Sequence, residues 1–141
     1  MALLGIDLGG TKLAAAIFSD DGNLIHKETV ALDKRKGKDV GQLITEQVSL
    51  FIHKGSAGGE NIKAVGISVP GIAHPGTGTA WVPNIEGWED YPLLDEVMHV
   101  CGNIPVTIDS DRACYILGEV WKGNASGCRD AIFLSDRKSV V

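Results

Sequence analysis

A glycine-rich stretch near the N-terminus holds a carboxylate, a hydroxyl and an ammonium group between two apolar runs. Its polar and flexible members are Asp7, Gly9, Gly10, Thr11 and Lys12. Glycine adopts positive φ at little cost and leaves neighbouring backbone N–H groups uncovered, so the stretch predicts a β-hairpin that turns at Gly9 and Gly10. Such amides, with Thr11 and Lys12, can surround the oxygens of a phosphate. Asp7 ends the first strand, where its carboxylate could hold Mg²⁺ directly or through water. The plainer alternative is a hairpin in which Asp7 and Thr11 only stabilise the turn.

A second carboxylate lies where a later apolar run meets a predicted helix. Residues 105–108 form the run, and Asp109, Ser110 and Asp111 follow it. Open α/β sheets bind ligands at the carboxyl ends of their strands, and a helix N-terminus favours an ionised carboxylate. We therefore expect Asp111 to act in chemistry. The alternative is that one of these three side chains caps the helix.

Between these two stretches, a Gly- and Pro-rich segment carries further candidate residues. Gly71 follows Val-Pro at the end of an apolar run, and Asn84 lies within residues 75–88, a segment too rich in Gly and Pro for a helix. The Asn84 side chain is as well suited to bonding its own backbone as to binding a ligand. Trp81 and Trp88 are expected to pack this segment, and the alternative is that they stack on a bound ligand.

Hydrophobic spacing places the candidate residues on an α/β framework. The predicted elements are a hairpin in residues 3–18, strands at 24–32, 62–69, 105–108 and 131–134, and helices at 40–52, 93–100 and 112–121. For the first helix we predict an N-cap at Asp39 and an end at Gly55, and Gly123 is expected to stop the last one. The order β-β-β-α-β-α-β-α-β predicts a mixed sheet that begins as an antiparallel meander and has helices packed on it.

Composition limits the possible partners. The chain has 141 residues, enough for one core, and a net charge of −5, with its one basic run at residues 34–38 predicted to be a solvated loop. These features argue against a nucleic-acid surface. The sequence has no apolar span long enough for a membrane and no signal peptide, which predicts a cytoplasmic protein. Three cysteines without Cys-x-x-Cys spacing predict reduced thiols and no structural zinc site.

Four motifs appear in a fixed order along the chain: Gly5–Lys12, Val69–Gly71, Val82–Trp88 and Asp111–Glu119. Together they resemble the N-terminal lobe of the ROK family, which contains bacterial glucokinases and related sugar kinases. The resemblance implies an actin-like, ribonuclease-H-like ATPase fold and a lobe spanning residues 1–135. Residues 136–141 match one translated frame of a sequencing adapter, so we expect them to be a non-native tail.

The resemblance also implies the chemistry. The reaction would be ATP-dependent phosphorylation of glucose or a related hexose, with the hairpin (Asp7, Gly9, Gly10, Thr11 and Lys12) at the ATP phosphates and Asp7 near Mg²⁺. Asp111 would be the general base, and Gly71, Asn84, Ser110 and Asp111 would contact the sugar. A second phosphate loop after residue 134, an adenosine site and further sugar ligands would lie outside this lobe. The full-length protein is expected to form a homodimer.

One position departs from the family pattern: Ser110 stands where the usual motif has Asn before the base. A hydroxyl reaches less far than an amide and offers different donors and acceptors, which affects sugar recognition. The rival function is the sugar-sensing part of a ROK transcriptional repressor, although Met1-Ala2 leaves no room for a preceding helix-turn-helix. A non-sugar ATPase of the same fold is a second rival, and Asn84 with Gly87-Trp88 argues against it.

Overall fold

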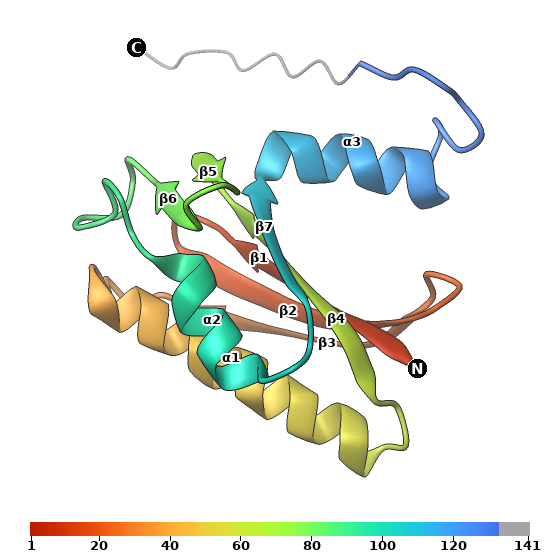
Figure 1. Cartoon of the computed structure of the whole chain (residues 1–141), viewed down its shortest axis with the longest axis horizontal. Coiled ribbons are helices and arrows are strands. Elements are labelled where there is room, and N and C mark those ends of the chain that lie inside the picture. Colours follow the sequence, from red (N-terminus) through yellow and green to blue (C-terminus); the bar gives the residue numbers. More distant parts are fainter. Residues whose placement is uncertain (133–141) are drawn as a thin grey trace. The chain divides into compact units, whose positions relative to one another are not determined.

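The computed structural model describes residues 1–132, which fall into two units divided after Asp111. The elements of the first unit are β1 (Ala2–Leu8), β2 (Lys12–Ser19), β3 (Leu24–Ala31), α1 (Lys38–Ala57), β4 (Ile62–Val69), β5 (Ile72–His74), β6 (Thr79–Trp81), α2 (Leu93–Cys101) and β7 (Val106–Ser110) (Figure 1). Helix α3 (Asp111–Lys122) starts with the last residue of this unit and continues into the second.

A five-stranded sheet in the order β3-β2-β1-β4-β7 forms the centre of the first unit. Strands β1, β2 and β3 pair antiparallel as a meander, while β4 pairs parallel to β1, and β7 parallel to β4. Parallel neighbours need crossover connections, and α1 and α2 lie in them. The mixed sheet that begins as a meander is thus confirmed.

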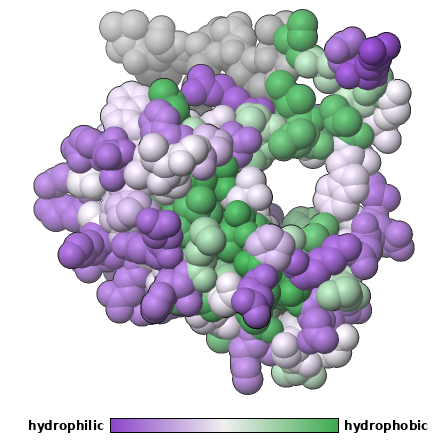
Figure 2. All heavy atoms as spheres, viewed as in Figure 1, coloured by the Kyte–Doolittle hydropathy of each residue, from purple (hydrophilic) through white to green (hydrophobic). Residues whose placement is uncertain are grey.

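One face of this sheet is buried under two helices. Leu4, Ile6 and Leu8 alternate along β1 with less buried residues, as expected of a strand with one covered face. On α1, the buried stripe comprises Val40, Leu43, Ile44, Val48 and Phe51. Helices α1 and α2 both lie on this side of the sheet in Figure 1. Figure 2 shows hydrophilic side chains over the outer sides of these helices and a band of hydrophobic ones beside them, over the strands.

The ends of α1 differ from the prediction. The helix starts at Lys38, which we had placed in a loop, and its N-cap is Gly37 with φ +52°, so Asp39 lies inside the first turn. It also continues through Gly55 to Ala57. A side chain at Gly55 would meet the carbonyl oxygen of Glu60 at 2.5 Å, so this glycine permits close chain approach and does not end the helix.

Three further differences concern the second half of the chain. The Gly- and Pro-rich segment contains a short antiparallel hairpin, β5–β6. Each strand has only three residues, which is too short for an alternation of apolar and polar residues to be recognised in the sequence. Helix α3 begins at Asp111, one residue early, and ends before Gly123 as predicted. Ala131 and Ile132 are not in a strand, and the rest of that predicted strand and the tail at 136–141 lie outside the described residues.

Candidate functional site

The turn between β1 and β2 presents unpaired hydrogen-bond donors. The amide of Gly9 donates to the carbonyl oxygen of Lys12 at 2.9 Å and closes the hairpin. Gly10, Thr11 and Lys12 are exposed. Within residues 1–132, neither the amides of Gly10 and Thr11 nor the Thr11 and Lys12 side chains have a hydrogen-bonding partner. Four donors are therefore available to an anion at this turn.

The reason for glycine in this turn differs from the prediction. Neither Gly9 nor Gly10 has a positive φ. A side chain at Gly9 would instead place its Cβ 2.9 Å from the Lys12 carbonyl oxygen, closer than such atoms normally approach. Gly10 faces open space, with nothing within 4 Å of the Cβ position. Gly9 thus allows the tight closure, and Gly10 leaves the amides uncovered.

Asp7 lies at the end of β1 on the sheet face opposite α1. It is exposed, while its neighbours Ile6 and Leu8 are buried on the helix side. Among the described residues, no hydrogen bond or ion pair engages its carboxylate. The carboxylate is consequently free to coordinate a metal ion or to accept a hydrogen bond from a bound molecule.

Strand pairing brings three polar residues into one row. Asp7 pairs with Ser68 of β4, and Ser68 pairs with Asp109 of β7, so all three side chains project from the same sheet face. The Ser68 Oγ is buried without a hydrogen-bonding partner. Two strand spacings, about 10 Å, separate the backbones of Asp7 and Asp109. Ser110 and Asp111 follow directly, so the hairpin and the candidate base share the carboxyl edge of the sheet.

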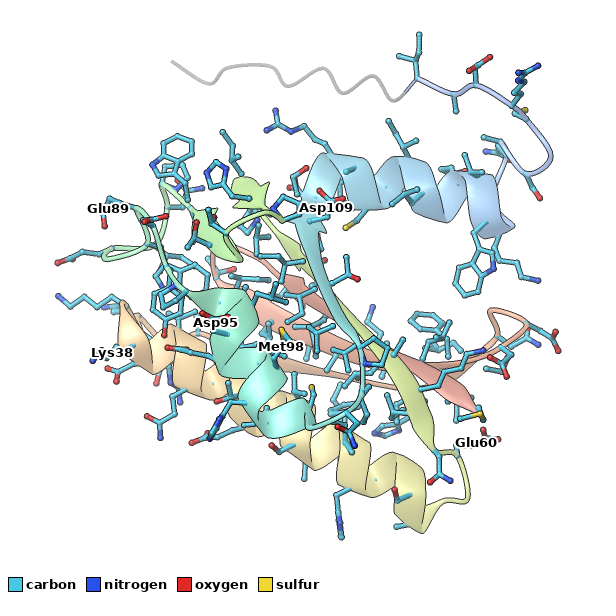
Figure 3. The ribbon with its side chains drawn as sticks, in the orientation of Figure 1. Lys38, Glu60, Glu89, Asp95, Met98 and Asp109 are labelled. Atoms are coloured by element: carbon cyan, nitrogen blue, oxygen red, sulfur yellow. The ribbon has the colours of Figure 1, made fainter. Side chains whose placement is uncertain are left out.

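The end of β7 is locally ordered by its own side chains. Asp109, at the C-terminal end of β7 in Figure 3, accepts a hydrogen bond from the Ser110 amide at 2.8 Å. Asp111 is the first residue of α3. The sequence pattern indicates Asp109 only as a possible helix cap and does not single out Ser68. The available signal is that β1, β4 and β7 each carry a polar residue one position before their C-terminal end.

The segment with Gly71 and Asn84 is fixed by close backbone packing. A side chain at Gly71 would collide with the carbonyl oxygen of Trp81, so only glycine lets the chain leave β4 at this angle. Asn84 is exposed, and its side chain makes no hydrogen bond within the described part of the chain. The alternative that Asn84 bonds its own backbone is therefore wrong.

Trp88 anchors this segment to the N-terminus of α1. Its side chain is 1% exposed, and its indole N–H donates to the Gly37 carbonyl oxygen at 3.0 Å. The indole stacks on Tyr91 with ring centroids 4.1 Å apart. Trp88 thus packs the segment as predicted, whereas the same prediction for Trp81 is wrong because Trp81 is 41% exposed.

Tyr91 supports this anchor electrostatically. Its hydroxyl donates to both carboxylate oxygens of Glu96 at 2.8 Å. Burial, and then the hydrogen bond to Glu96, raise the pKa of the Tyr91 phenol well above its usual value. The hydroxyl therefore stays a donor across the physiological pH range, and the link between Tyr91 and α2 persists.

These groups fit a nucleotide phosphate with its magnesium ion. Backbone amides and an ammonium group bind phosphate oxygens, and an exposed carboxylate suits Mg²⁺, which keeps several waters and takes one or two carboxylates. Residues 1–132 contain no group of three His, Cys, Asp or Glu side chains that could hold a metal. Asp7 would thus supply the protein ligand, with water and phosphate oxygens completing the shell. Within the same range, no helix has both the length and the apolar character needed to cross a membrane.

Comparison with known proteins identifies the family of the chain. The ROK family model matches residues 3–135. The chain belongs to the ROK family. It is 33% identical over 129 residues to the glucokinase of Thermotoga maritima, covering 90% of this chain and 39% of that enzyme. It is also 29% identical over 136 residues to the xylose repressor of Caldicellulosiruptor bescii, covering 95% of this chain and 34% of the repressor.

Solved structures agree on the fold. The ROK hexokinase from Thermus thermophilus superposes with a TM-score of 0.77 at 31% identity, over 90% of this chain and 41% of that one. A ROK glucokinase from Streptomyces griseus, solved with glucose and AMPPNP, gives 0.71 at 28% identity, over 90% of this chain and 38% of that one. The actin-like ATPase fold is thereby confirmed. The chain spans about two fifths of the length of the glucokinases it matches.

Proposed function

We propose that the chain is the N-terminal lobe of an ATP-dependent hexose kinase, with glucose or a related hexose as the substrate. The supporting observation is the shared row of Asp7, Ser68 and Asp109, which brings a phosphate-binding turn and a candidate base to one edge of the sheet. Phosphoryl transfer needs an aligned nucleophile and stabilised phosphate charge, which these two groups would provide.

Each group has a distinct part in this proposal. The free amides of Gly10 and Thr11 and the Lys12 ammonium bind phosphate oxygens, and Asp7 faces the hydrated Mg²⁺. When bound, ATP would supply the phosphoryl group and Mg²⁺ would neutralise part of the phosphate charge. Asp111 would accept the proton of the sugar hydroxyl as that oxygen bonds to the γ-phosphorus of ATP and the bond to the β-phosphate breaks, releasing ADP. Gly71, Asn84 and Ser110 orient the hexose from the neighbouring strand ends.

The sugar and nucleotide sites can be tested separately on this chain by NMR. In a ¹⁵N-labelled sample, Mg²⁺ with AMPPNP is expected to shift the amides of Gly10, Thr11 and Lys12. Glucose is expected to shift those of Gly71, Asn84 and Ser110, each at millimolar concentration because one lobe encloses neither ligand. The matched control is Asn103, an exposed polar residue at the opposite end of β7. Absence of both sets of shifts would contradict the proposal.

Because a xylose repressor is among the relatives, a sugar-sensing function is the second candidate. A sugar sensor has no need of a phosphate cradle. It would therefore show the glucose-type shifts without the nucleotide shifts at the hairpin. The exposed amides of Gly10 and Thr11, which have no hydrogen-bonding partner within residues 1–132, favour the kinase, because they leave the turn open to an anion that only the kinase would bind there.

A further inference from the structure

The hairpin β5–β6 has two chemically different faces. Ala73 pairs with Ala80, which is fully buried and bridges to Tyr91, so this pair faces inward. Side chains alternate along a strand, so the neighbouring pair of Ile72 and Trp81 faces outward. Ile72 is 44% exposed and Trp81 41% exposed. Two large apolar side chains therefore lie side by side on the outer face.

The exposure of Trp81 is unlike the environment of Trp88. The Trp88 indole is buried and its N–H is bonded, whereas the Trp81 indole has no hydrogen-bonding partner within residues 1–132. Single exposed apolar residues are common and need no explanation. Trp81 and Ile72 are instead paired in register and form one continuous apolar surface. The indole N–H of Trp81 is a hydrogen-bond donor at the edge of this surface.

This surface adjoins the proposed sugar contacts. Ile72 directly follows Gly71, and Gly71 packs against the backbone of Trp81. Asn84 comes three residues after Trp81. Strand β5 also lies beside β7, whose last residue is Ser110. The hairpin is thus next to the groups proposed to orient the hexose: Gly71 and Asn84 are close to it along the chain, and Ser110 ends the strand beside β5.

We propose that Trp81 is a specificity-determining residue on which the hexose ring stacks, with Ile72 extending the apolar surface. A pyranose has a hydroxyl rim and a face of C–H groups. The rim suits the polar groups at Gly71, Asn84 and Ser110, and the C–H face suits the negative face of an indole. The indole N–H is free to donate to a hydroxyl at the ring edge. This inference rests on the proposed function and adds the apolar half of sugar recognition to it.

The test uses saturation-transfer NMR on the 141-residue chain with glucose. We expect the sugar C–H protons to receive saturation from the Trp81 ring and the Trp81 indole N–H signal to shift. Trp81→Ala should weaken glucose binding between about twofold and tenfold, as expected for one lost stacking contact. Trp81→Phe keeps an aromatic face and should retain most of the affinity.

Trp121→Ala is the matched control, because Trp121 is 45% exposed and carries no proposed role. Its glucose affinity should equal that of the unmodified chain, and amide spectra should confirm that each variant is folded. If glucose shifts Asn84 and Ser110 but leaves Trp81 unaffected, the stacking role is wrong and the sugar site stands. If glucose shifts none of them, the sugar side of the proposed function fails as well.

Discussion

Asp111 is the residue on which the proposed chemistry depends most directly. Asp111→Ala removes the carboxylate proposed to accept the sugar proton, so we expect turnover to fall by about 10²–10⁴-fold. Nucleotide affinity should change little, because the proposed phosphate site is the Gly9–Lys12 turn. The measurement is glucose-dependent ADP release by a chimera that joins residues 1–132 to the remaining part of the Thermotoga maritima glucokinase.

Asp109→Asn in the same chimera is the control for position and charge. It keeps the hydrogen bond to the Ser110 amide and changes a carboxylate two residues from the base. Turnover within a few fold of the unmodified chimera is expected. A chimera with Asp111→Ala that turns over at the normal rate would show that Asp111 is only the start of α3.

The residues that make up the candidate site differ in how far their positions could be predicted from the sequence. Asp7 and Asp111 could be predicted because polar residues at the ends of apolar runs occupy strand termini whatever the details of packing. Ser68 and the exposed Trp81 could not, because each depends on a partner distant in sequence. The pairing of β4 with β1 decides what Ser68 faces, and the register of β5 with β6 decides which way Trp81 points.

At the scale of elements, the contact between α1 and the segment after β6 holds the candidate site in place. Gly41 on α1 packs so closely against the Tyr91 hydroxyl that a side chain at this position would collide with it. In an open helix, Gly→Ala stabilises by about 1 kcal/mol. Here the clash should outweigh that gain, since overpacking costs about 1–3 kcal/mol. Gly41→Ala is therefore expected to lower the free energy of unfolding, measured by urea denaturation.

Gly66→Ala in β4 is the matched control for this prediction. Nothing lies within 4 Å of the Cβ position at Gly66, so a methyl group fits without displacement. Its free energy of unfolding should stay the same or rise slightly, because alanine loses less conformational freedom on folding. Equal urea midpoints for the two variants would contradict a tight contact between α1 and Tyr91.

Element order was easier to predict than element boundaries. The apolar stripe of α1 and the alternation in β1 follow from periodicity and gave the correct element types. The predicted cap at Asp39 and the predicted end at Gly55 were both wrong, because the residue types that cap helices also occur inside them. Asp39 lies in the first turn of α1, and Gly55 allows the chain at Glu60 to approach closely. Only the position of Glu60 against Gly55 distinguishes the two roles.

At the scale of the whole molecule, the open question is what these 141 residues can do alone. The chain spans about two fifths of the glucokinases it matches. The resemblance to ROK kinases implies that ATP would lie in a cleft between two lobes and receive phosphate contacts from both. The Gly9–Lys12 turn would reach the nucleotide from one side only, which would leave the phosphate charge exposed to water and screened by salt.

We therefore predict that the 141-residue chain binds glucose and nucleotide weakly and does not transfer phosphate between them. Alignment of the γ-phosphate with the sugar hydroxyl accounts for roughly 7–11 kcal/mol of barrier lowering, and a single lobe cannot hold both reactants in line. A coupled ADP-release assay with glucose and other hexoses measures this, with the chimera as the positive control. Sugar-dependent turnover by the chain near that of the chimera would show that the parts at this one sheet edge suffice for catalysis.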